Sequence, residues 1–229
     1  ELELAGDVLV VTGFVSPARR ALLEQVPALN PAVASVDLSG TRLDGDAAAA
    51  LARRELNAPA GVTITPMADR LAVSGIDAAW YAAASGNIGP FGGWPVDFTP
   101  MREDLSQRLD ALGTAMNGSE LMFDRLFELT DDSRQSLDGL AAQLVDFMDV
   151  AAALEISVTV QLLGFADGQG NRERNLEIKL ERGRTVQQEL VSRGVDASRF
   201  TVVPATWESG RSDPSMRKVV LQLTTEDFP

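Results

Sequence analysis

Three polar residues in the C-terminal half have the types and spacing of a binding site for a small zwitterion. Asp167 follows the strand-like residues 158–164 in a Gly-rich loop, and Arg182 lies on an amphipathic segment that becomes helical near Asn175. A helix rises 1.5 Å per residue, so Arg182 lies about 10 Å along it and its guanidinium can reach back toward the loop. We expect Asp167 to bind an ammonium and Arg182 a carboxylate, each contact contributing about 1.5–3 kcal/mol. A turn aspartate and a solvated helix arginine, with no ligand, fit the same pattern.

The composition excludes much of the chemistry that enzymes use. The chain has no Cys and no His, which removes thiol nucleophiles, disulfides, imidazole bases and the usual zinc sites. It also lacks the G-x-S-x-G, H-E-x-x-H and P-loop motifs. We therefore expect a protein that is not an enzyme and that carries neither a cofactor nor a metal.

Length and charge narrow the class further. The 229 residues are 45% hydrophobic and 23% charged, which is typical of one large or two modest globular domains. The net charge of −13 is shared by both halves, and an acidic surface disfavours nucleic acid and unaided adhesion to anionic lipid. No run of 18 apolar residues predicts a transmembrane helix.

Residues 1–100 contain a weak internal repeat, with units at about 1–40 and 41–100. Residues 6–13 are echoed by residues 68–75, and residues 36–39 by residues 96–99. β-branched runs and helix caps predict the order helix, strand, strand, helix, strand, with the first helix missing from the first unit. The expected strands are 7–13, 33–39, 62–65, 70–74 and 96–99, and the expected helices are 16–26, 44–56 and 78–84.

The shared patterns D-x-L-x-V-[ST]-G and V-D-[LF]-[ST] resemble those of tandem BON modules. That resemblance implies an envelope-associated region with membrane phospholipid or envelope proteins as its partners. Two similar α/β units packed around one core, with no ligand, are the alternative. Phe91 and Trp94 lie in the Gly- and Pro-rich loop 87–95, where they either form a contact surface or fold back to close a core.

Apolar residues at helical spacing over residues 101–116 predict a connecting helix at 101–118, followed by a second domain at 119–229. That domain reads as βαβαββ, with strands at 120–124, 156–162, 200–203 and 218–224. We expect an α+β fold with one layer of helices on one sheet. The two helices carry these apolar stripes: Leu137, Leu140, Ala141, Leu144 and Met148, then Leu176, Leu180, Gly183, Val186 and Leu190 before Gly194.

Several motifs of the second domain resemble those of the OmpA C-terminal family, the peptidoglycan-binding domain shared with MotB and Pal lipoproteins. G-F-A-D at 164–167 resembles the family's G-[HY]-T-D, and the segment 175–183 resembles its N-x-x-L-S-x-x-R-A. Phe123-Asp124 resembles the opening F-D, and residues 216–219 resemble the terminal N-R-R-V strand. The resemblance covers residues 120–223.

The resemblance implies that Asp167 and Arg182 bind the diaminopimelate of the peptidoglycan stem peptide. Asn175, Phe123, Asp124 and Arg217 are implied as secondary contacts. The chain departs from the family pattern at six positions, and we expect the loss of hydroxyl and amide groups among them to weaken the bracing of the loop. They are Phe165, Ala166, Ile178, Lys179, Gly183 and Met216.

Together these features predict a cell-envelope protein of a Gram-negative bacterium, held in the periplasm by a membrane-anchoring segment outside this sequence and tethering the envelope to the wall. The rival hypothesis is a degenerate OmpA-like domain that serves as a protein–protein scaffold in an envelope assembly.

Overall fold

A computed structural model of the chain describes residues 1–86, 88–167, 171–206 and 213–227. The chain divides into two compact units, residues 1–105 and residues 106–229. The division falls within the helix α5 (Thr99–Met116), whose residues at 101, 105, 109, 112 and 116 are all buried, as the spacing predicted. Within the described residues no helix is long and apolar enough to span a membrane.

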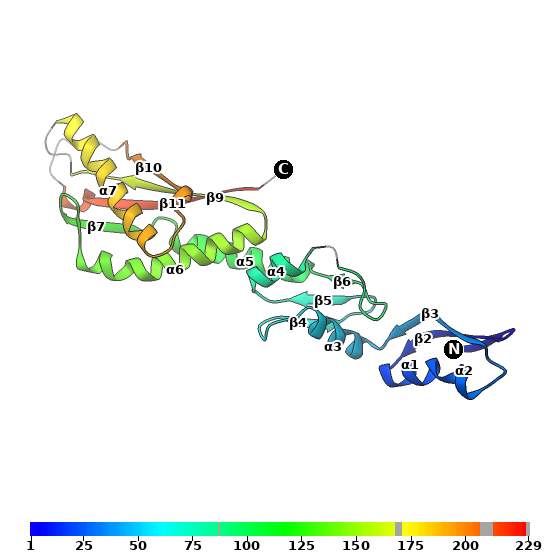
Figure 1. Cartoon of the computed structure of the whole chain (residues 1–229). Coiled ribbons are helices and arrows are strands. Elements are labelled where there is room, and N and C mark those ends of the chain that lie inside the picture. Colours follow the sequence, from blue (N-terminus) through cyan, green and yellow to red (C-terminus); the bar gives the residue numbers. More distant parts are fainter. Residues whose placement is uncertain (87, 168–170, 207–212, 228–229) are drawn as a thin grey trace. The chain divides into compact units, whose positions relative to one another are not determined.

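Unit 1 contains two three-stranded sheets, which Figure 1 shows in blue and cyan. The first half is β1 (Leu2–Ala5), β2 (Val8–Val15), α1 (Pro17–Glu24), α2 (Val26–Leu29) and β3 (Ser35–Leu43). The second half is α3 (Gly45–Glu55), β4 (Thr63–Pro66), β5 (Leu71–Ser74), α4 (Ala78–Ala84) and β6 (Val96–Asp97). The helix expected at 16–26 ends at Glu24, and a second helix that was not expected follows, with Pro27 in its first turn, where the missing N–H is tolerated.

The internal repeat extends to the pairing of the strands. In each half the first two strands are antiparallel and the second and third are parallel. Val10 pairs with Asp37 in the first sheet, and Ala72 pairs with Asp97 in the second, so the repeated positions share one register. The resemblance to BON modules itself stays a prediction.

Each parallel strand also carries the same local hydrogen bond. Asp37 Oδ1 accepts from the backbone N–H of Ser39 at 2.9 Å, and Asp97 Oδ1 accepts from that of Thr99 at 3.0 Å. The pKa of both carboxyl groups is lowered, first by hydrogen bonding with the side chains of Ser39 and Thr99 and then by these backbone bonds. The sequence echo therefore reflects a repeated turn as well as a repeated strand.

The aromatic loop of unit 1 closes a core. Trp94 is only 5% exposed, and its indole N–H donates to the carbonyl oxygen of Leu43 at 2.7 Å. The ring of Phe14 lies 5.8 Å from it, centroid to centroid. Phe91 is half-buried and forms an isolated bridge with Trp94. Of the two interpretations of this loop, the one that closes a core holds for Trp94.

Unit 2 contains one five-stranded sheet in the order β10-β9-β11-β7-β8, in which only β9 and β10 are parallel. The helices α6 and α7 pack against this sheet and against each other. The elements are β7 (Glu120–Arg125), β8 (Glu128–Leu129), α6 (Asp131–Ala153), β9 (Ile156–Gly164), α7 (Arg172–Ser192), β10 (Phe200–Pro204) and β11 (Lys218–Asp227). The predicted order βαβαββ therefore lacks one strand, β8, which has only two residues and gives no periodic signal.

The buried helix faces differ from the predicted stripes in two places. On α6 the buried residue is Phe147, and Met148 is only half-buried. On α7 the expected Leu176 is 46% exposed, whereas Lys179 and Arg182 are buried. A stripe of apolar residues predicts the helix face incorrectly where long basic side chains form part of the buried face.

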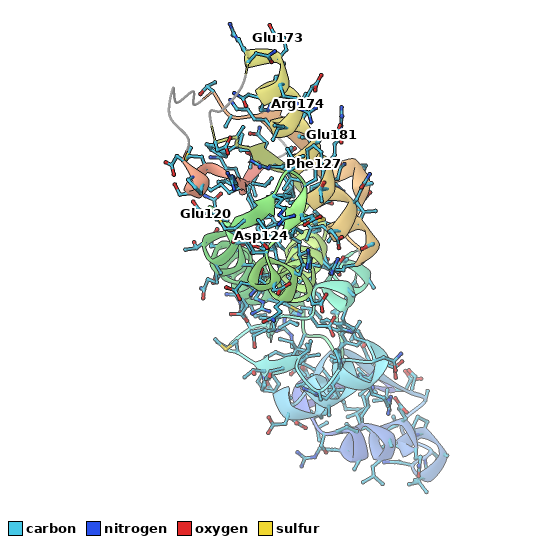
Figure 2. All side chains as sticks on the ribbon, turned by 90° about the vertical axis from the view of Figure 1, so that its left-hand side faces the viewer. Glu120, Asp124, Phe127, Glu173, Arg174 and Glu181 are labelled. Atoms are coloured by element: carbon cyan, nitrogen blue, oxygen red, sulfur yellow. The ribbon has the colours of Figure 1, made fainter. Side chains whose placement is uncertain are left out.

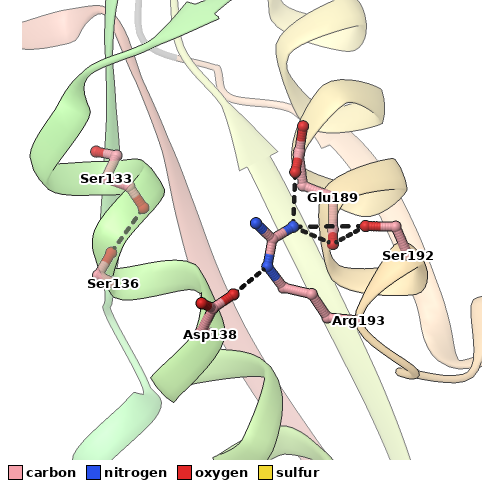
Figure 3. A network of polar contacts seen from close by, with 6 residues as sticks. All are labelled: Ser133, Ser136, Asp138, Glu189, Ser192 and Arg193. Atoms are coloured by element: carbon pink, nitrogen blue, oxygen red, sulfur yellow. Dashed lines mark hydrogen bonds and ion pairs between the residues drawn. The ribbon is translucent and has the colours of Figure 1, made fainter.

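A polar network fastens the two helices of unit 2 to each other (Figure 3). Arg193, at the C-terminal cap of α7, donates through Nε to Asp138 of α6 at 2.7 Å and through Nη1 to Glu189 at 2.6 Å. Both carboxylates raise the pKa of Arg193, with the Glu189 hydrogen bond first. The next residue, Gly194, ends the helix with φ of 98°, as the sequence predicted.

Candidate ligand-binding site

The site is built where β9 runs against α7, and a glycine makes that approach possible. A Cβ added to Gly164 would lie 1.9 Å from the carbonyl oxygen of Lys179, closer than any side chain tolerates. Because the last residue of β9 has no side chain, the strand lies directly on the helix backbone. The residues that follow, Phe165 to Asp167, are thereby held beside α7.

Arg182 is the central residue of the site. Its side chain is only 3% exposed, so the interpretation as a solvated helix arginine is wrong. Nε donates to the carbonyl oxygen of Leu126 and Nη1 to that of Phe165, each at 2.8 Å. The guanidinium carbon lies 5.3 Å from the centroid of the Phe123 ring, a cation–π distance. Arg182 therefore ties the β7–β8 turn to the end of β9.

Burial lowers the pKa of Arg182 to about 10, while the Asp167 carboxylate acts to raise it and the Arg217 guanidinium to lower it. A pKa of about 10 leaves the group charged at pH 7. Within the described part of the chain, Nη2 has no hydrogen-bond acceptor, although a guanidinium offers donors on all three nitrogens. The structure thus holds a positive charge in place with donor capacity left for a carboxylate.

Asp167 lies beside a second arginine. Arg217 Nη2 and Nε lie 2.9 and 3.0 Å from Asp167 Oδ2, so one carboxylate oxygen meets both nitrogens. Arg217 Nη1 also donates to the carbonyl oxygen of Asp124 at 3.3 Å, while the Asp124 side chain itself is exposed. Asp124 therefore joins the site through its backbone.

Asn175 lies further into the helix than the sequence indicated. The helix α7 begins at Arg172, with the Asn171 side chain accepting from the backbone N–H of Arg174 at 2.8 Å as the N-cap. Asn175 shares a helix face with Lys179 and Arg182 at the spacing i, i+4, i+7. Its Oδ1 is buried and has no hydrogen-bond partner, the only such side-chain atom found in the described residues.

At two of the positions that depart from the family pattern, the residue present makes a contact that the sequence did not predict. Lys179 is buried, and its ammonium donates to the carbonyl oxygen of Ala205 at 2.7 Å, which links α7 to the end of β10. A Cβ on Gly183 would lie 2.4 Å from Val202 Cγ1, so the smaller residue lets β10 approach the helix. The carbonyl oxygens of Leu126 and Phe165 were also missed, since a backbone acceptor leaves no signal in residue type.

Charged side chains of both signs lie on the face of unit 2 around the ends of β7 and α7. Figure 2 shows Asp124 and Phe127 from the β7–β8 segment on the same side of this unit as three α7 residues. Four of the six labelled side chains are carboxylates, and they belong to Glu120, Asp124, Glu173 and Glu181.

Unit 1 has a separate open groove of about 810 Å³ between α1, α3, β3 and residues 92–93. Its lining is mostly apolar, including Leu43 and Leu51, with Arg20 and Arg54 also present. Each of these arginines has a carboxylate neighbour, Glu24 and Glu55 respectively.

Comparison with solved structures finds OmpA-like, Pal and MotB domains over about half of this chain. The peptidoglycan-associated lipoprotein from Burkholderia pseudomallei is 19% identical, with 46% of this chain and 89% of that one covered and a TM-score of 0.37. The OmpA-like domain of FopA1 from Francisella tularensis is 16% identical over 48% and 72%, with a TM-score of 0.34. A periplasmic domain of Helicobacter pylori MotB is 16% identical over 48% and 78%, with a TM-score of 0.37.

These domains come from the group of proteins that residues 120–223 resemble in sequence. No protein-family model matches the sequence, and a search of curated proteins finds no match.

Proposed function

We propose that unit 2 binds peptidoglycan non-covalently through the diaminopimelate of the stem peptide, and that the protein acts by binding rather than by catalysis. The observation that carries the proposal is Arg182, which is buried, charged and fixed by two carbonyl oxygens, with Nη2 left without a partner in the described residues. A guanidinium fixed in this way binds a carboxylate with little loss of side-chain entropy.

Diaminopimelate matches the charges around Arg182. In the stem peptide one end of this diamino acid has a free ammonium and a free carboxylate on one carbon, so that end can place its carboxylate on Arg182 and its ammonium near Asp167. The two protein groups are close enough for the Asp167 carboxylate to act on the pKa of Arg182. Asn175, on the same face of α7, offers an unsatisfied acceptor for an N–H group of the peptide.

Sedimentation with purified sacculi tests the proposal. We expect the wild-type chain to pellet with sacculi, and Arg182→Ala and Asp167→Asn to remain largely in the supernatant. Arg184→Ala is the matched control, because Arg184 lies on the same helix, is exposed and pairs with Glu181. The proposal fails if wild type and Arg182→Ala pellet equally little, or if Arg184→Ala loses as much binding as Arg182→Ala.

A protein–protein scaffold is the second candidate. It is favoured by the loss of polar side chains at Phe165 and Ala166, of which Ala166 is 2% exposed and offers no hydroxyl. A scaffold would retain its partners from an envelope extract when Arg182 is replaced, whereas a wall-binding protein would lose sacculi. The two candidates are thus separated by the same variant.

For unit 1 we propose an envelope contact through the groove, with a membrane phospholipid as its occupant. The apolar lining suits acyl carbons, and a phosphate would replace Glu24 and Glu55 as the partners of Arg20 and Arg54. Flotation with liposomes of phosphatidylglycerol, compared with phosphatidylcholine, tests this role. If wild type and the double variant Arg20→Ala, Arg54→Ala are recovered equally with both kinds of liposome, the groove is excluded as the phospholipid-binding site. With the wall bound by unit 2, the protein would tether the envelope from the periplasm.

A further inference from the structure

We infer that Arg217 is a specificity-determining residue of this site, because it occupies the oxygen of Asp167 that an incoming ammonium needs. The inference rests on the proposed function, since it concerns how diaminopimelate enters the same site. It assigns to Arg217 the role of a competitor for Asp167, in place of the role of a ligand contact.

Two nitrogens of the Arg217 guanidinium contact the same carboxylate oxygen. Arg217 Nη2 and Nε lie 2.9 and 3.0 Å from Asp167 Oδ2. The Asp167 side chain is 16% exposed and that of Arg217 is 31% exposed, so the acid is more enclosed than its partner. An ammonium that binds Oδ2 therefore has to displace Arg217.

The charges around Asp167 oppose an ammonium while Arg217 remains in place. Asp167 supplies one negative charge, and Arg182 and Arg217 supply two positive ones that interact with each other. The group of three therefore has a net charge of +1 and attracts a carboxylate more strongly than an ammonium. When Arg217 moves away, the remaining pair is neutral and matches a zwitterion.

Arg217 is able to move without loss of the fold around it. Its side chain is bonded to Asp167 and, at 3.3 Å, to the Asp124 carbonyl oxygen, whereas its backbone pairs with β7 just before β11 begins at Lys218. The carbonyl oxygen of Arg217 accepts from the backbone N–H of Phe123 at 2.7 Å. The Arg217 side chain can therefore leave Asp167 while the backbone pairing with β7 stays in place. A ligand with only carboxylates has no ammonium that could take the place of Arg217 on Asp167.

The test compares two ligands that differ in their ammonium groups. Calorimetric titration with meso-diaminopimelate and with pimelate, the dicarboxylate that lacks both ammonium groups, is made on the full chain and on Arg217→Gln. We expect Arg217→Gln to bind diaminopimelate about fivefold more tightly, the gain from removing one partly exposed ion pair. Pimelate should show no gain, because one positive charge has been lost.

Arg199→Gln is the control, since Arg199 is an exposed arginine of the same unit that pairs with Asp196. Arg217→Lys retains the charge but cannot contact Asp167 through two nitrogens. Its affinity for diaminopimelate should lie between those of wild type and Arg217→Gln. A weaker affinity of Arg217→Gln for diaminopimelate, or an equal gain for pimelate, overturns the inference.

The outcomes also separate the inference from the proposed function. If the wild-type chain and Arg217→Gln pellet equally with sacculi and have the same affinity for diaminopimelate, the role of Arg217 is overturned and wall binding stands. Failure of the wild-type chain and of Arg217→Gln to bind either sacculi or diaminopimelate overturns both.

Discussion

At the scale of single residues, two glycines determine how closely the sheet approaches α7. Gly164 faces the backbone of Lys179, and Gly183 faces the side chain of Val202. A backbone atom cannot move away without shifting the helix, whereas a valine side chain has room to adjust. The two positions therefore differ in how much a methyl group would cost.

We predict that Gly164→Ala lowers the free energy of unfolding by about 3 kcal/mol or more, and Gly183→Ala by about 1–2 kcal/mol. Urea denaturation followed by circular dichroism measures both. Gly139→Ala is the control, because Gly139 lies within α6 with no atom near its added Cβ, and alanine there should stabilise by about 0.5–1 kcal/mol.

The cause at Gly183 is checked by a second substitution. Val202→Ala removes the methyl group that the new Cβ would meet, so the double variant should lose less stability than the two single changes added together. Strict additivity would mean that the Val202 contact is not the reason for glycine at this position.

At the scale of elements, the sequence predicted what periodicity and capping control. The helix α4 (Ala78–Ala84) and the buried face of α5 were predicted as they are, since both have regular apolar spacing or a clear cap. The capping role of Asn171 was missed, so α7 was placed too late. The site was half predicted: Asp167 and Arg182 follow from charge and spacing, whereas Leu126 and Phe165 contribute backbone oxygens that residue type does not encode.

Arg193 makes a polar link between α6 and α7, and we predict that Arg193→Ala lowers the free energy of unfolding by about 1 kcal/mol. The expected loss exceeds that of an ordinary surface pair because one guanidinium joins carboxylates of two helices. Measurement in 0.1 M and 1 M salt should show the difference shrinking as salt rises. Arg174→Ala, which breaks a pair within α7 only, is the control and should change stability much less.

At the scale of the whole molecule, the two compact units divide the proposed roles. A fragment that begins at Thr99 contains all of α5 and the whole of unit 2. We predict that this fragment folds alone and pellets with sacculi as the full chain does, whereas residues 1–98 do not. Circular dichroism and the sacculus assay on both fragments check the prediction. Loss of wall binding by the fragment that begins at Thr99 would mean that residues of unit 1 are needed for binding.

The paired aspartate turns of unit 1 have a consequence for the behaviour of this protein in acid. The pKa of Asp37 and of Asp97 is lower in the folded chain than the ordinary 3.8, so the folded state holds these protons less tightly than the unfolded chain does. Their contribution to stability is full above pH 3.8 and is lost as the pH falls through the lowered values. Because the turn occurs once in each sheet, acidification weakens both halves of unit 1 over the same pH range, and Asp37→Asn with Asp97→Asn should flatten its acid unfolding curve.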